Sequence, residues 1–272
     1  MLVGIMQNSL VAHDLRKSFR LASQAKADGL EIACDLPEEV LSLLGPEGIE
    51  QVLSLKKTHK IEVPSIGLGV LRESESLFGD EKTASEAKDV IHRAIGSARE
   101  IGAGIVLVPF LGKAAIELED ELDRVIQNLD ELAEEAEGAS VTLGIESTLN
   151  VNQQQHLLEH LGAYTSVKVY YDTGNALARK FDPATYLREL GPDRVCQMHF
   201  KDVRLGEEGT PPDFDVALGK GNVDFPAVAS AIAAMDYPGW VILETPCTDT
   251  PLAAAKANIK FARSILHHHP ES

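Results

Sequence analysis

The sequence is poor in cysteine and in positive charge. Its three cysteines, Cys34, Cys196 and Cys247, lie far apart and form no Cys-x-x-Cys pair, so we predict reduced thiols in a cytoplasmic protein. Lys and Arg number 25 against 42 Asp and Glu, which gives a formal charge of −17. Because binding to nucleic acid or to an anionic membrane depends on clustered Lys and Arg, this balance argues against both kinds of partner.

Other expected signals are also missing. Residues 1–7 have no basic stretch and only a short apolar run, so we expect neither a signal peptide nor a membrane anchor there. No Gly-rich phosphate loop follows Ile5 and Met6 in the first expected strand, which disfavours a dinucleotide-binding open sheet. No low-complexity segment or change of composition divides the chain. We therefore predict one domain over residues 1–266, followed by a flexible tail over 267–272.

What the sequence does contain is a regular alternation of short apolar runs with helical patterns. Strands are expected at 1–7, 30–34, 61–69, 104–110, 141–146, 167–172, 195–199 and 240–244. Between two of them, Thr83 and Glu86 have capping-box spacing and predict that a helix starts at Thr83. Such alternation implies a parallel sheet, and eight repeats in 272 residues favour closure. The predicted fold class is α/β, a single (β/α)8 TIM barrel.

The fifth to eighth expected strands each end on an ionisable residue: Glu146, Asp172, His199 and Glu244. One such residue could simply face water, but parallel strands are otherwise apolar, and barrel sites lie at these carboxyl ends. Since alternate residues of a strand share a face, all four side chains can converge at the mouth of the barrel. Three converging carboxylates would repel one another, so we expect one divalent metal ion. Mn²⁺ is the expected ion, with Mg²⁺ or Co²⁺ as alternatives and Zn²⁺ less suited to an oxygen-rich set.

These four residues stand in motifs of a known family. They occur in Gly-Ile-Glu, Asp-Thr-Gly-Asn, His-Phe-Lys-Asp and Ile-Leu-Glu-Thr, and residues 219–225 read Gly-Lys-Gly-Asn-Val-Asp-Phe. This set resembles the motifs of the xylose-isomerase-like TIM barrels, which include sugar phosphate isomerases and epimerases such as the ketose 3-epimerases. The resemblance covers nearly the whole chain. It implies that Glu146, Asp172, His199 and Glu244 bind one metal ion and that Glu146 and Glu244 also form the catalytic acid/base pair.

The expected substrate is a small sugar or sugar phosphate, and the expected chemistry is proton transfer. A metal ion held by the sugar's carbonyl and a neighbouring hydroxyl would acidify the adjacent C–H bond and stabilise the resulting enediolate. One glutamate would take the proton. Its return by the second glutamate from the opposite face gives an epimer, and return to the neighbouring carbon gives an isomer. Glutamates on well-separated strands favour epimerisation.

Three further residues are predicted to contact the substrate: Asn175, Lys201 and Arg204. Asn175 stands where many relatives have a histidine that contacts substrate, and an amide can hydrogen-bond a hydroxyl but cannot act as an imidazole does. Lys201 shares the strand face of His199, and Arg204 follows at the rim. Substrate orientation can therefore differ from that in those relatives.

Two other functions remain open. A dehydratase of a keto-sugar or keto-inositol would pass through the same enediolate and expel a neighbouring hydroxyl, whereas a non-catalytic barrel would bind a sugar tightly without turnover. Strands three and four end without extra histidines, which disfavours a multi-zinc nuclease like endonuclease IV. The sequence does not determine which sugar is bound, whether it carries a phosphate that Lys220 could bind, or whether the chain forms a homo-oligomer.

Overall fold

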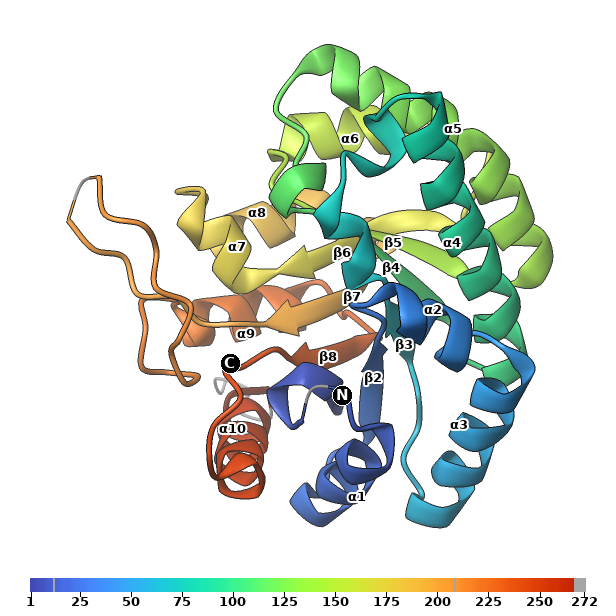
Figure 1. Cartoon of the computed structure of the whole chain (residues 1–272). Coiled ribbons are helices and arrows are strands. Elements are labelled where there is room, and N and C mark those ends of the chain that lie inside the picture. Colours follow the sequence, from blue (N-terminus) through green and yellow to red (C-terminus); the bar gives the residue numbers. More distant parts are fainter. Residues whose placement is uncertain (12, 208, 267–272) are drawn as a thin grey trace. The chain divides into compact units, whose positions relative to one another are not determined.

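The structure is a computed structural model that describes residues 1–11, 13–207 and 209–266. The tail predicted at 267–272 lies outside the described residues. Eight parallel strands, hydrogen-bonded to one another in sequence order, form a closed barrel, which confirms the predicted fold class (Figure 1). The strands are β1 (Leu2–Met6), β2 (Gly29–Ala33), β3 (Ser65–Gly67), β4 (Ile105–Phe110), β5 (Thr142–Ser147), β6 (Val167–Asp172), β7 (Val195–Phe200) and β8 (Trp240–Leu243).

Helices follow the strands in the order expected of βα repeats. They are α1 (Leu15–Ala25), α2 (Pro37–Leu43), α3 (Pro46–His59), α4 (Glu81–Ile101), α5 (Glu119–Ala139), α6 (Val151–His160), α7 (Thr173–Ala178), α8 (Pro183–Leu190), α9 (Phe225–Ala234) and α10 (Pro251–Leu266), with short 3-10 turns η1 (Gln7–Ser9), η2 (Gly69–Glu73), η3 (Ser76–Phe78), η4 (Gly112–Ala114) and η5 (Pro192–Arg194). Within the described part of the chain, no helix combines the length and the apolar character needed to cross a membrane.

The chain divides into two compact units, of which the first contains Met1–Glu31, His59–Glu62 and the chain from Tyr171 onward. In this unit β1 pairs with both β2 and β8, so strands from opposite ends of the sequence are neighbours. Helices α1 (blue) and α10 (red) likewise pack against each other (Figure 1). Three of the predicted metal ligands, Asp172, His199 and Glu244, belong to this unit.

The second unit contains Ile32–Thr58 and Val63–Tyr170. Its longest strand pairing joins β4 to β5, from Ile105 opposite Thr142 to Phe110 opposite Ser147. Helix α4 packs against α5 and against η3. Glu146 belongs to this unit, near the end of β5.

The local structure departs from the sequence predictions at three places. Helix α4 is capped by Asp80, whose carboxylate accepts from the Thr83 backbone N–H at 2.8 Å, so the predicted start at Thr83 is wrong by two residues. The third strand is only three residues long, whereas a strand was predicted over 61–69, and Pro64, which has no N–H to donate to the ladder, directly precedes it. The short helix α7, which was not predicted from the sequence, begins directly after β6.

Candidate metal centre

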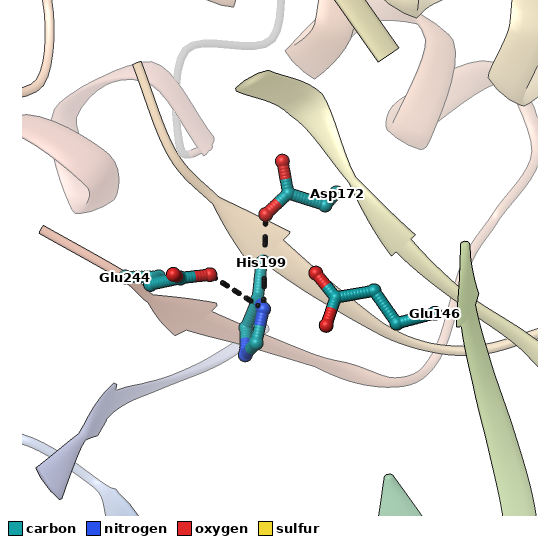
Figure 2. A group of neighbouring side chains, drawn as sticks. All are labelled: Glu146, Asp172, His199 and Glu244. Carbon is teal, nitrogen blue, oxygen red and sulfur yellow. Dashed lines mark ion pairs between the residues drawn. The ribbon is translucent and has the colours of Figure 1, made fainter. Parts of the chain in front are cut away.

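His199 lies at the middle of the candidate site. It is part of β7, it is 1% exposed, and its ring contacts carboxylates through both nitrogens. Nε2 lies 2.8 Å from Glu31 Oε1, while Nδ1 lies 3.0 Å from Glu244 Oε2 and 3.8 Å from Asp172 Oδ2. Figure 2 shows the Glu244 and Asp172 contacts as dashed lines. The imidazole is therefore enclosed by acidic groups inside the first unit.

Asp172 is both the last residue of β6 and the N-cap of α7. Its Oδ1 accepts from the Asn175 backbone N–H at 2.6 Å, and its Oδ2 faces the His199 ring. An aspartate at an N-cap satisfies one of the backbone N–H groups left over at the start of a helix. The same local geometry fixes the carboxylate, so the strand-to-helix junction determines where Asp172 points.

Glu244 follows β8 directly and is held by two partners. The Lys201 ammonium lies 2.6 Å from Oε1, and the His199 ring lies 3.0 Å from Oε2. Burial alone would raise the pKa of Glu244, but the charges of Lys201 and His199 and the hydrogen bonds from both hold this pKa well below its usual range. Glu244 is therefore an ionised carboxylate at neutral pH, available as a ligand or as a base.

Glu146 completes the predicted set. It is a buried residue of β5, 5% exposed. Each of Glu146, Asp172, His199 and Glu244 offers one ligand-type atom, and these four atoms all lie within 4.8 Å of one another (Figure 2). The four side chains thus form a candidate divalent metal site.

The donor set of this site fits a divalent cation. Glu31 as a carboxylate can only accept, so His199 Nε2 carries a hydrogen. A hydrogen on Nδ1, which the ring can donate to Glu244 when no metal is bound, is released when a cation binds and leaves a lone pair on Nδ1. Nδ1, Glu244 Oε2 and Asp172 Oδ2 consequently bring one lone pair and two carboxylate oxygens close together. A cation relieves this repulsion, and carboxylate oxygens with one imidazole suit Mn²⁺, Mg²⁺ or Co²⁺.

The residues predicted to contact substrate lie at different distances from this centre. Lys201 joins it, since its ammonium pairs with Glu244 and lies 5.1 Å from the centre of the Phe214 ring. Asn175 lies in the first turn of α7, beside Asp172. Arg204 is exposed and pairs with Asp213 at 3.0 Å, at a short antiparallel bridge in the loop that follows β7.

A second carboxylate, Asp202, organises the loop between β7 and α9. It is 1% exposed. Its oxygens accept from four backbone N–H groups, those of Val203, Lys220, Gly221 and Val223, at 2.8–3.1 Å. Gly221 has no room for a side chain, because a Cβ there would meet the Asp202 carboxylate and the Val203 carbonyl. The Gly-Lys-Gly segment thus wraps around an internal anion, and Asp202 occupies the backbone N–H groups that a phosphate at Lys220 would need.

Sequence reasoning missed Glu31 and Gln197. Glu31 lies in β2, which is buried at every position, and its Oε2 accepts from Gln197 Nε2 at 3.4 Å. The available signal was the presence of a charged residue between Leu30 and Ile32, in a strand that should be apolar throughout. Its partner on β7 could not be read from the sequence, because β2 and β7 are not adjacent strands.

Known proteins resemble most of this chain. Residues 19–265 match the family model described as xylose isomerase-like TIM barrel. The fructoselysine 3-epimerase of Shigella flexneri is 29% identical over 273 residues, which cover 93% of this chain and 93% of that protein. The inosose dehydratase of Geobacillus kaustophilus (strain HTA426) is 27% identical over 195 residues, which cover 66% of this chain and 52% of that protein.

A solved structure shows the same fold. The D-psicose 3-epimerase from Clostridium cellulolyticum H10, crystallised with D-tagatose, matches with a TM-score of 0.79 at 15% identity. The match covers 98% of this chain and 100% of that one.

Proposed function

Because the chain belongs to the xylose isomerase-like TIM barrel family, we propose that it is a divalent-metal-dependent epimerase or isomerase of a ketose sugar or sugar phosphate. Its relatives support an enzyme of the isomerase class. The observation that carries the proposal is the meeting of Asp172 and Glu244 at His199, with Glu146 as the fourth ligand-type residue. We further propose that residues 1–266 act as one domain. A cytoplasmic location is also proposed, and the free cysteines Cys34, Cys196 and Cys247 support it.

Mn²⁺ is the proposed ion, held by Glu146, Asp172, His199 and Glu244. Three of these four ligands are carboxylates, and hard oxygen ligands favour Mn²⁺ or Mg²⁺ over the nitrogen and sulfur sites that zinc prefers. When bound, such an ion withdraws charge from a substrate carbonyl and so makes the neighbouring C–H bond more acidic.

Glu146 and Glu244 are the proposed proton carriers. The Lys201 ammonium keeps Glu244 ionised, so its carboxylate can accept a proton from substrate carbon. Glu146 would then deliver a proton from the opposite face, which inverts the carbon and yields an epimer. Lys201, Asn175 and Arg204 are proposed to contact substrate oxygens, with Lys201 placed best because it already touches Glu244.

Solvent deuterium should enter the carbon next to the ketose carbonyl when the Mn²⁺-loaded protein is incubated with substrate in D₂O. The exchange follows because the abstracted proton equilibrates with water on the glutamate before it returns. NMR of a panel of ketoses and ketose phosphates, each with and without Mn²⁺, measures it. Metal-loaded protein that exchanges no such proton across the panel would refute the proposal.

The dehydratase alternative is favoured by one observation, the similarity to inosose dehydratase. Mass spectrometry of the same reaction mixtures separates the two reactions. An epimerase returns a ketose of unchanged mass apart from deuterium, whereas a dehydratase product is lighter by one water molecule.

Lys201→Met should move the acidic limb of the pH profile of kcat/KM to higher pH. Burial raises the pKa of Glu244, and Lys201 is the strongest of the influences that lower it. Without Lys201 this pKa rises, so the carboxylate is protonated, and lost as a base, at a higher pH than in the wild type. Lys17→Met, which removes the same charge from the exposed face of α1, is the control and should leave the limb in place. An unmoved limb in Lys201→Met would contradict this role.

A further inference from the structure

Glu31 is an ionisable residue in a parallel strand, where apolar residues are expected at every position. It lies in β2 between Leu30 and Ile32, and its side chain is 0% exposed. Burying an ionised carboxylate is unfavourable unless hydrogen-bond donors or an opposite charge compensate it. A leucine would suit this strand better for packing alone. Glu31 therefore needs a reason other than core formation.

The partners of Glu31 supply that reason. Oε1 lies 2.8 Å from His199 Nε2, and Oε2 lies 3.4 Å from Gln197 Nε2. Both partners come from β7 and are two residues apart, so they share one face of that strand. The buried Glu31 carboxylate thus contacts two side chains of β7, the strand that carries the candidate metal ligand His199.

The contact decides which nitrogen of His199 is free to bind a cation. Because a carboxylate only accepts, Nε2 must be the protonated nitrogen. In the neutral ring Nδ1 then presents its lone pair on the side where Glu244 and Asp172 lie, at 3.0 and 3.8 Å. The opposite tautomer would place a hydrogen on Nδ1, toward those carboxylates, and would block metal binding through that atom.

We propose that Glu31 is a positioning residue that selects the Nε2–H tautomer of His199, fixes the orientation of its ring and strengthens Nδ1 as a metal ligand. The inference rests on the metal site of the proposed function and concerns a residue outside its ligand set. Carboxylates that accept from a metal-binding histidine generally raise the basicity of the ring, and their loss costs about 10–100-fold in metal affinity or activity.

Glu31→Leu removes the acceptor that faces His199 Nε2 and Gln197 Nε2, so it should lower the thermal midpoint of the metal-free protein as well as its Mn²⁺ affinity. Glu31→Gln separates the positioning role from a role in folding, because it keeps an acceptor oxygen of the same size without the charge. The thermal midpoint of metal-free Glu31→Gln should stay closer to that of the wild type than that of Glu31→Leu does. Mn²⁺ binding, measured by calorimetry on the same folded proteins, should weaken in both variants, by about 10–100-fold in Glu31→Leu.

Gln197→Leu is the matched control. It removes a second partner of Glu31 from the same face of β7, and it leaves the 2.8 Å contact with His199 in place. Its Mn²⁺ affinity should stay within about threefold of the wild type, well inside the 10–100-fold loss expected of Glu31→Leu. Equal losses of Mn²⁺ affinity in Gln197→Leu and Glu31→Leu would mean that Glu31 affects the site only through packing, and would overturn the proposal.

The tautomer gives a readout that needs no metal and no substrate. In protein carrying ¹⁵N-labelled histidine, the ring signals of His199 are identified by their loss in His199→Gln. The wild type should carry a hydrogen on Nε2 at neutral pH, whatever the state of Nδ1, and Glu31→Leu should show less Nε2–H, because the acceptor that faces Nε2 is gone. An unchanged tautomer together with unchanged Mn²⁺ affinity would overturn the inference.

These outcomes are distinguishable from failure of the proposed function. If Mn²⁺ binding depends on Glu31 but no ketose exchanges a proton, the proposed activity is wrong and the positioning role stands. If the protein epimerises a ketose and Glu31→Leu binds Mn²⁺ as the wild type does, the positioning role is wrong and the activity stands.

Discussion

Replacing Glu244 with glutamine should lower kcat/KM by about 10²–10⁴-fold, the range that general acid–base catalysis usually contributes. The amide keeps an oxygen toward the metal site but cannot accept a proton from carbon. Steady-state kinetics at saturating Mn²⁺, with metal content measured on the same samples, separates loss of the base from loss of the ion. Glu50→Gln, an exposed change on α3, is the matched control and should have wild-type activity.

The two glutamates should also be separable by the kind of defect they cause. If Glu146 and Glu244 act on opposite faces, either variant can still remove and return a proton on the face of the remaining glutamate. Each single variant should then exchange solvent deuterium into one epimer without converting it to the other. A Glu244→Gln protein that still interconverts the epimers within about tenfold of the wild-type rate would exclude Glu244 as a proton carrier, since loss of a general base costs at least about 10²-fold.

Asp202→Asn should lower the free energy of unfolding by about 2–4 kcal/mol, because an amide NH₂ would face backbone N–H groups that now donate to a carboxylate. Asp202 is 1% exposed and accepts from Val203, Lys220, Gly221 and Val223. Leaving even one or two of these buried donors without an acceptor costs about 1–3 kcal/mol each. Urea denaturation of metal-free protein measures the loss.

Asp182→Asn makes the same chemical change at an exposed helix cap. Asp182 accepts from the Thr185 backbone N–H at 2.8 Å at the start of α8. Since asparagine caps helices about as well as aspartate does, this variant should change the free energy of unfolding by only about a few tenths of a kcal/mol. Equal stabilities of the two variants would show that the loop does not depend on Asp202.

The loop result bears on the choice between sugar and sugar phosphate. The resemblance of Gly219–Phe225 to a family motif, and the presence of Lys220 in it, left a phosphate site open. In the structure this segment binds the Asp202 carboxylate through the N–H groups of Lys220 and Gly221. The glycine spacing is thus explained by an internal carboxylate, and the backbone N–H groups of Lys220 and Gly221 are not available to a substrate phosphate.

Local pattern was sufficient for the overall architecture. Alternating apolar runs and helical patterns predicted the barrel, because each βα repeat can be recognised within a stretch of about thirty residues. It was insufficient where a single residue serves two elements. Asp172 ends β6 and caps α7 at once, so a helix that begins directly at the strand end was not predicted. Similarly, the N-cap of α4 is Asp80, about one helical turn before Thr83, where the capping-box spacing had predicted the start of the helix.

The sequence by itself determined the fold and the identity of the four ligand-type residues, since strand period and strand ends are local properties that place Glu146, Asp172, His199 and Glu244 at equivalent positions. Only the tertiary structure decided what each charge pairs with. It paired Lys201 with Glu244 and Glu31 with His199. Each pair joins residues from different strands or strand ends, and the free energy of a buried charge depends on the partner that the completed fold brings within a few ångströms.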